Sequence, residues 1–279
     1  MNLNELKNAS FSDIEDKAFQ AIQRIFPCET ELLDKIPMDK MISYFQKDLT
    51  PSEHPFLIRA AGQSGSGKSS QIVPALEYAL KKQRYIRLSV GSFAVFHPNY
   101  DEWLQTNPSK MREKTNGFAL RALVLFYRYC ILNRISVLLD MTLLEPEIDI
   151  YLMMLAKKMN YQIQMHLLCV PKKVSNTFIR LRQAQTGRFV DPTSGNYFFS
   201  ALGRSLKALT NSHLFKEYDK LILWSHYMSY PIKQTHLDNS SVNRLLNEYQ
   251  GKSFTVKNPK ELLKVKKKWM KLFMELINV

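Results

Sequence analysis

The sequence predicts an α/β protein with a doubly wound, mostly parallel sheet. Two observations support this fold class. Apolar segments of strand length alternate with helical segments across residues 55–225 of the 279-residue chain. The first strand is followed by a glycine-rich segment and then by a helix, the order found in P-loop NTPases and kinases.

Each expected strand is a short apolar or alternating run that ends at a polar or glycine-containing segment. Residues 135–140, for example, are continuously apolar until their final acid. Such runs are typical of parallel strands that are covered on both faces. We expect strands at residues 55–61, 84–90, 135–140, 161–170 and 220–224.

The expected helices lie between these strands, where apolar residues recur every three or four positions. The first covers residues 70–82, and Pro74 should bend it because proline removes a helical N–H. We expect the other helices of the core at residues 117–133, 147–159, 172–185 and 197–209.

Charge and pattern divide the chain into three expected parts. Residues 1–50 form an N-terminal helical segment with six Lys or Arg and nine Asp or Glu. Residues 51–225 form the kinase-like core, and residues 226–279 form a basic, helical extension packed on it. The net charge of +14 favours anionic partners such as nucleotides or an acidic protein, although a solvated basic face is an equal alternative for the tail.

Composition excludes several classes of protein. The sequence contains no apolar run of membrane-spanning length, and its polar N-terminus is unlike a secretory signal. The three cysteines are scattered without metal-ligand spacing, which is typical of reduced thiols in a cytoplasmic protein. No helix-turn-helix, zinc-finger or RNA-recognition pattern is present, so we do not expect nucleic acid as a partner.

The glycine-rich segment reads Gly-Gln-Ser-Gly-Ser-Gly-Lys-Ser over residues 62–69 and matches the Walker A pattern. Glycines let the backbone turn so that successive N–H groups point at phosphate oxygens. We expect Lys68 to reach the β- and γ-phosphates of ATP and to be solvated when no ligand is bound. The expected ATP-binding residues are Gly62, Gln63, Ser64, Gly65, Ser66, Gly67, Lys68, Ser69 and Ser70.

A Mg²⁺ site is expected where this loop meets the end of another strand. Ser69 occupies the Walker A position whose hydroxyl binds Mg²⁺. The strand at residues 135–140 ends in Asp140, and ligands of open parallel sheets bind beyond the carboxyl ends of the strands. We therefore expect Ser69 to bind Mg²⁺ directly and Asp140 to hold it through a water molecule.

Four segments occur in an order that a known family shares. They are the loop at residues 62–69, Phe-x-x-x-His-Pro-Asn-Tyr-Asp at residues 93–101, Asp-Met-Thr at residues 140–142 and Thr-Gly-Arg at residues 186–188. This order resembles the zeta toxins, P-loop kinases of toxin–antitoxin systems that phosphorylate UDP-N-acetylglucosamine. The resemblance implies an ATP- and Mg²⁺-dependent phosphotransferase, a small hydroxylated acceptor such as a nucleotide sugar, and an acidic antitoxin as a partner.

The resemblance also implies roles for single residues. Arg188 and Arg182, or Arg180 in place of Arg182, would neutralise charge on the γ-phosphoryl group, a task that suits the guanidinium fork. Asp140 and Thr142 stand where the family has Glu-Gly-Thr. The expected catalytic residues are thus Lys68, Asp140, Arg182 and Arg188, and the expected acceptor contacts are Ser89, Phe93, His97 and Thr142. For Phe93 a place in the core stays open as the alternative, because aromatic residues as dense as those around it are more often core residues.

The sequence departs from the family on the acceptor side. The family carries Asp-x-Asp-x-Phe-Arg/Lys before the His-Pro, and its second Asp activates the acceptor hydroxyl, whereas residues 89–94 read Ser-Val-Gly-Ser-Phe-Ala. Gly91 cannot accept a proton, so we nominate Asp140 as a substitute base. A catalytically inactive ATP-binding protein that acts through a protein partner stays open as an alternative. Two roles are equally open for His97, a substrate contact or the ordering of the turn before Pro98.

Overall fold

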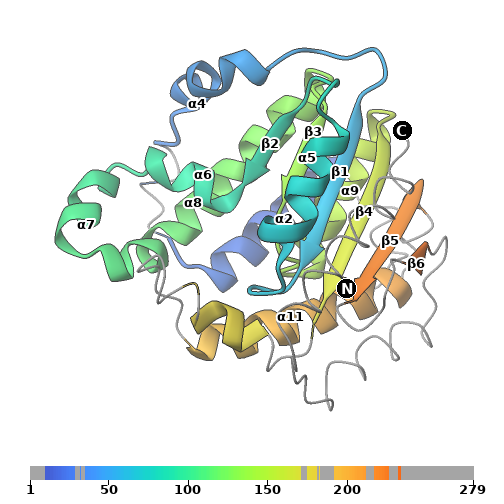
Figure 1. The fold of residues 1–279 in the computed structure, drawn as a ribbon. Helices are drawn as coiled ribbons and strands as arrows, with labels where there is room; N and C mark the ends of the chain where they lie inside the picture. Colours follow the sequence, from blue (N-terminus) through green and yellow to red (C-terminus); the bar gives the residue numbers. More distant parts are fainter. Residues whose placement is uncertain are drawn as a thin grey trace.

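The computed structural model describes residues 10–28, 32, 35–170, 175–180, 182, 192–211, 217–225 and 232–233. Its centre is a sheet with the strand order β2-β3-β1-β4-β5-β6 (Figure 1). The strands are β1 (Phe56–Gly62), β2 (Ile86–Ser89), β3 (Val137–Asp140), β4 (Gln162–Cys169), β5 (Lys220–Ser225) and β6 (Ile232–Lys233). The first five are parallel, and the short β6 is antiparallel to β5. The predicted α/β fold with a mostly parallel sheet is confirmed.

The strand order reverses direction at β1, which lies between β3 and β4. In the register of the sheet, Ala60 pairs with Asp140 on one side and with His166 on the other. Ser89 at the end of β2 also pairs with Asp140. The carboxyl ends of β1, β2 and β3 therefore lie at one edge, where sheets of this kind bind their ligands.

Helices cover both faces of the sheet (Figure 1). On one face lie α2 (Phe11–Ile25), α4 (Met38–Phe45), α8 (Pro108–Leu132), α9 (Pro146–Lys158) and α11 (Pro192–Asn211). The other face is covered by α5 (Val73–Ala79), which follows a π-helical turn over Lys68–Ile72. Short helices at Gln46–Asp48, α6 (Val90–Phe93), Ala94–Phe96 and α7 (Tyr100–Thr106) connect the larger elements.

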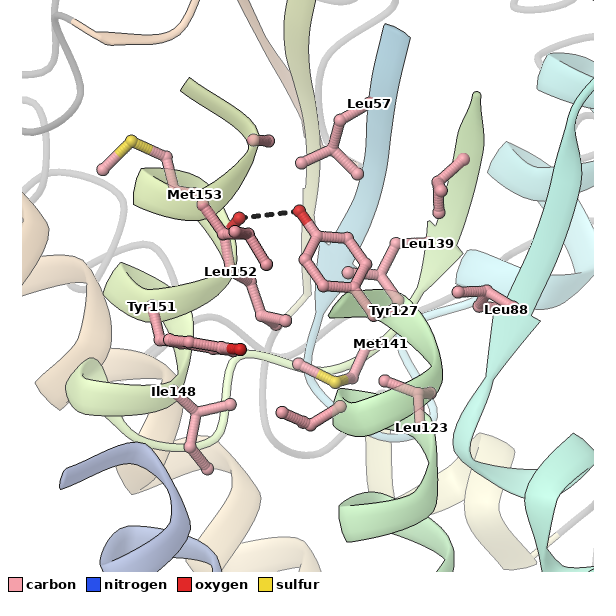
Figure 2. Close-up of a cluster of buried hydrophobic side chains, with 14 of the residues drawn as sticks. Leu57, Leu88, Leu123, Tyr127, Leu139, Met141, Ile148, Tyr151, Leu152 and Met153 are labelled. Carbon is pink, nitrogen blue, oxygen red and sulfur yellow. Dashed lines mark hydrogen bonds between the residues drawn. The ribbon is translucent and has the colours of Figure 1, made fainter. Parts of the chain in front are cut away.

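Side-chain alternation along β1 builds two cores. Leu57 and Ala61 face the larger core, whereas Ile58 and Ala60 face the smaller core under α5. Figure 2 shows part of the larger core, where side chains of α8 and α9 meet those of β1, β2 and β3. The buried Tyr127 hydroxyl donates to the Leu152 carbonyl oxygen at 2.6 Å and so links α8 to α9.

The N-terminal helix α2 belongs to this larger core. Ser10 caps it, with its hydroxyl accepting from the Asp13 N–H while the Asp13 carboxylate accepts from the Ser10 N–H. Its apolar face, with Ile14 and Ile22, is buried. The expected boundary at residue 50 stays a prediction, and the expected extension over residues 226–279 lies, apart from β6, outside the described residues. No helix in the described ranges is both long and apolar enough to cross a membrane.

Three helix starts differ from the prediction by at least three residues: α5 begins at Val73 instead of residue 70, α11 begins at Pro192 instead of residue 197, and α8 differs most. The long helix begins at Pro108 instead of residue 117, because the Asn107 side chain accepts from the Lys110 N–H at 3.3 Å and proline suits the first helical position. Its first turns are polar, so no apolar periodicity marks them. The turn that precedes Pro74 is π-helical, and Val73 donates to the carbonyl oxygen of Lys68, five residues back. The bend expected at Pro74 stays a prediction.

Candidate functional site

The loop after β1 has a backbone that requires glycine. Gly62 has φ 143° and Gly65 has φ 72°, values in the region that side chains disfavour. A Cβ atom at Gly62 would lie 2.1 Å from the Leu168 carbonyl oxygen, and one at Gly65 would lie 2.4 Å from the Ser175 carbonyl oxygen. The two glycines therefore let the loop pass directly against the end of β4 and the helical residues 175–180.

Side-chain contacts hold the loop in this shape. The buried Gln63 amide donates to the Val170 carbonyl oxygen just after β4. The Ser175 hydroxyl donates to the Ser64 carbonyl oxygen. The protein thus fixes the loop conformation through its own contacts, and a ligand that binds there does not have to order it.

Lys68 begins the helix after the loop and is buried, with 8% of its surface exposed. Its Nζ atom donates to the carbonyl oxygens of Gly62 at 3.0 Å and Gln63 at 3.1 Å. The expectation of a solvated lysine is therefore wrong: the side chain folds over the loop and bonds its backbone. This position places the ammonium group within the turn that the Walker A pattern assigns to phosphate.

Ser69, in the turn after the loop, contacts Asp140 at the end of β3, as predicted. The Ser69 hydroxyl donates to Asp140 Oδ2 at 2.8 Å. The carboxylate is held at this edge because Asp140 is the last residue of β3 and pairs with Ala60 of β1. A hydroxyl and a carboxylate are hard oxygen ligands that fit Mg²⁺, which is usually bound by one or two protein groups together with phosphates. Among the described residues, no three or more His, Cys, Asp or Glu side chains form a group that could hold a metal ion.

Arg87 is a site residue that the sequence analysis missed. It lies on the edge strand β2, and its Nη2 atom donates to Asp140 Oδ2 at 3.2 Å. Its Nη1 atom donates to Glu77 Oε1 on α5 at 3.0 Å. The alternating pattern of β2 gave no sign of this role, because the contact depends on β2 lying beside β3 in the sheet.

Of the two positions that carry Asp in the acceptor motif of the resemblance, one is Ser89 and the other is Gly91. The hydroxyls of Ser89 and Ser92 are 2.8 Å apart and share a hydrogen bond. Gly91 is exposed, and Thr142, just beyond β3, is half-buried. Asp140 is the single carboxylate among the terminal residues of the five parallel strands, since the others end in Gly62, Ser89, Cys169 and Ser225.

Two predicted acceptor contacts take structural roles instead. Phe93 is fully buried, and its ring packs against Phe45 of α4 and Phe126 of α8. The prediction that Phe93 contacts substrate is therefore corrected, because the ring is part of the aromatic core. His97 is 4% exposed, and its Nδ1 atom accepts from the Asn99 N–H at 3.1 Å. Of its two open roles, the structure therefore favours ordering of the turn around Pro98.

Two of the expected arginines, Arg180 and Arg182, lie in a segment that starts against the loop. Ser175 opens this helical segment and contacts Ser64. Arg180 is exposed and Arg182 is half-buried. Arg188 lies outside the described residues. The charge-neutralising roles of these arginines stay predictions.

A family model described as "Zeta toxin" matches residues 42–235, a range that contains the loop, Arg87 and Asp140. The chain belongs to the zeta toxin family. The expectation from the sequence is thereby confirmed at the level of the family.

Individual relatives of this zeta toxin family member are distant. The "uncharacterized kinase mug58" of Schizosaccharomyces pombe is 29% identical over 87 residues, which cover 30% of this chain and 31% of that protein. The chain thus spans about a third of the length of that curated relative.

Among solved structures, one from the PezAT toxin–antitoxin system of Streptococcus pneumoniae has a TM-score of 0.61 and 17% identity, covering 90% of this chain and 99% of that one. Another, of AvrRxo1-ORF1 with AvrRxo1-ORF2 and ATP, has a TM-score of 0.48 and 13% identity, covering 95% and 88%. At 17% identity, the PezAT likeness shows the fold and nothing finer.

Proposed function

We propose that this protein is an ATP-dependent phosphotransferase that phosphorylates a hydroxyl group of a small acceptor, such as the nucleotide sugar UDP-N-acetylglucosamine. The observation that carries the proposal is the 2.8 Å contact between Ser69 and Asp140, which joins a Walker A loop to a carboxylate at the ligand-binding edge. Family membership and the name of the yeast relative support the same reaction class.

The loop residues would hold the triphosphate of ATP. The backbone N–H groups of residues 63–69 and the Lys68 ammonium are the donors for phosphate oxygens. When bound at Ser69 and Asp140, Mg²⁺ supplies positive charge to the β- and γ-phosphates. Arg182 would approach the γ-phosphoryl group from the segment that Ser175 opens, and Arg182 and Arg188 would stabilise its charge during transfer.

In the reaction, the acceptor oxygen forms a bond to the γ-phosphorus while the bond to the bridging oxygen breaks and ADP leaves. The acceptor proton is released to Asp140 or to water. Because Asp140 already accepts from Ser69 and Arg87, its main task here is to hold the metal site. Catalysis then rests on positioning and charge stabilisation, which dominate in phosphoryl transfer.

The proposal is tested by incubating purified protein with Mg²⁺-ATP and a panel of hydroxylated acceptors that includes nucleotide sugars. We expect phosphorylated acceptor and ADP in equal amounts, detected by ³¹P NMR. A Lys68→Ala variant should lose this activity. If the protein binds ATP but consumes none with any acceptor, the phosphotransferase proposal is wrong.

A second candidate is a catalytically inactive ATP-binding protein that acts through a protein partner. Ser89 and Gly91 favour it, because they replace both carboxylates of the family's acceptor motif. This candidate requires that ATP raises the melting temperature while Asp140→Asn leaves the cellular effect unchanged. Loss of that effect in a folded Asp140→Asn variant would contradict it.

An acidic protein partner is part of the proposal. The net charge of +14 favours such a partner, and the PezAT structure comes from a toxin–antitoxin system. A complex with an acidic protein encoded beside this gene should weaken as salt is raised. Affinity that is independent of salt would argue against charge as its basis.

A further inference from the structure

The Arg87 guanidinium spans two carboxylates that belong to different parts of the site. One arm donates to Asp140 Oδ2, the same oxygen that accepts from the Ser69 hydroxyl. The other arm donates to Glu77 on the helix that follows the loop. The Asp140 side chain is 6% exposed, whereas the Arg87 and Glu77 side chains are 40% and 36% exposed.

This arrangement puts a positive charge on the carboxylate that would hold Mg²⁺, directly or through a water molecule. A cation bound at Ser69 and Asp140 would lie within a few ångströms of the guanidinium, and two positive charges at that distance repel each other. The Asp140 carboxylate is mostly buried, so solvent screens this repulsion less than at an open surface. Arg87 and Mg²⁺ therefore compete for the same carboxylate.

The surroundings leave room for the Arg87 side chain to move. Its side chain lines a groove of about 540 Å³ together with Thr50, Glu77, Arg84 and Tyr85. The groove is open to solvent, so the guanidinium can turn away from Asp140 while it keeps its bond to Glu77. Glu77 thus holds Arg87 whether or not Asp140 is shared with a metal ion.

We propose that Arg87 is a positioning residue that competes with Mg²⁺ for Asp140, and that Glu77 weakens this competition by holding the other arm of the guanidinium. This inference rests on the proposed ATP and Mg²⁺ site. It adds that the metal affinity of the site is set by an ion pair on the edge strand, outside the Walker A loop.

The test measures how strongly Mg²⁺ improves nucleotide binding. The dissociation constant of a fluorescent, non-hydrolysable ATP analogue is determined in EDTA and in saturating Mg²⁺, and the ratio of the two constants reports the coupling between metal and nucleotide. We expect Arg87→Gln to raise this ratio about three- to tenfold, because a competing charge is removed. We expect Glu77→Gln to lower it by about a factor of two, since Arg87 then favours Asp140.

Three further variants separate competition from general electrostatics. Arg84→Gln removes the same charge from the same groove, but the Arg84 side chain donates to Thr50 at 3.4 Å and not to Asp140, so the ratio should not change. Because Glu77 acts through Arg87, the double variant Arg87→Gln/Glu77→Gln should match Arg87→Gln alone. Arg87→Lys keeps the charge but cannot bridge two carboxylates as a fork, and should give an intermediate ratio.

The outcomes distinguish this inference from the proposed function. If the analogue fails to bind the wild type in either condition, the loop is not a nucleotide site and both are wrong. If the analogue binds and Mg²⁺ helps, but Arg87→Gln and Arg87→Lys both keep the wild-type ratio, only the competition is refuted. An equal rise in Arg84→Gln would also refute it, because the effect would then be one of net charge.

Discussion

Replacement of Lys68 by alanine should damage both nucleotide binding and the stability of the free protein. The Nζ atom donates to two loop carbonyls, at 3.0 and 3.1 Å, from a side chain that is 8% exposed. Hydrogen bonds that involve a charged group contribute about 1.5–3 kcal/mol each when one partner is removed. Water can enter the space left by the side chain and bond the carbonyls, so we expect a net loss of about 1–2 kcal/mol in the free energy of unfolding.

The effect on ATP follows from the lost contact with phosphate. Loss of one charge-assisted contact should raise the dissociation constant roughly ten- to a hundredfold. At an ATP concentration a hundred times the wild-type constant, ATP stabilises the wild type by about 2.7 kcal/mol. At the same concentration the variant should gain only about 0.4–1.4 kcal/mol.

Urea denaturation with and without a non-hydrolysable ATP analogue measures both quantities. Lys81→Ala is the matched control, because Lys81 is an exposed lysine just after α5 that lies against Tyr78 and not against the loop. It should keep the full stabilisation by ATP. Equal stabilisation of Lys68→Ala and wild type by ATP would show that this loop is not the nucleotide site, and an unchanged free-state stability would refute the inference from its hydrogen bonds.

Three further predictions concern the scaffold of the site. Gly62→Ala should destabilise the protein in urea and abolish ATP binding, because its Cβ would lie 2.1 Å from the Leu168 carbonyl oxygen. Asp149→Ala should cost about 3–5 kcal/mol in urea denaturation by leaving the Arg59 charge buried, and the double variant Arg59→Met/Asp149→Leu should recover most of it. Burial lowers the pKa of His166 to about 3, so stability should fall by about 1.4 kcal/mol per pH unit as the pH drops below about 6.5, and His166→Leu should remove this slope.

The parts of the fold that could be predicted are those in which burial leaves a local pattern. The parallel strands were located to within two residues at each end, because strands covered on both faces are apolar throughout and end where polar residues begin. The start of α8 was missed because its first turns, from Pro108, carry polar side chains and show no apolar periodicity. The order of the strands could not be predicted either, since it depends on contacts between distant segments.

In the candidate site, too, features with a local sequence pattern could be predicted, and features that depend on contacts between distant segments could not. The loop and Asp140 could be predicted, because their functions depend on backbone shape and on a strand end, and both are local features. Arg87 could not, because its contact with Asp140 exists only when β2 lies beside β3. For Phe93 the family motif was misleading: the residue type fits the motif, but the packing of α6 against α8 makes its ring part of the core.

The absence of the two acceptor carboxylates should lower the rate of phosphoryl transfer only moderately. A positioned general base typically contributes about 10²–10⁴-fold to a rate. Phosphoryl transfer has a loose transition state that needs little activation of the nucleophile. The decrease in rate caused by the missing base should therefore lie toward the lower end of that range. In the proposed reaction, the groups that remain, Lys68, Ser69 and Asp140, would act on the charge of the transferring phosphate, where most of the stabilisation arises. A slow kinase is therefore the physical expectation for this site, and a slow rate that still depends on Lys68 would identify it.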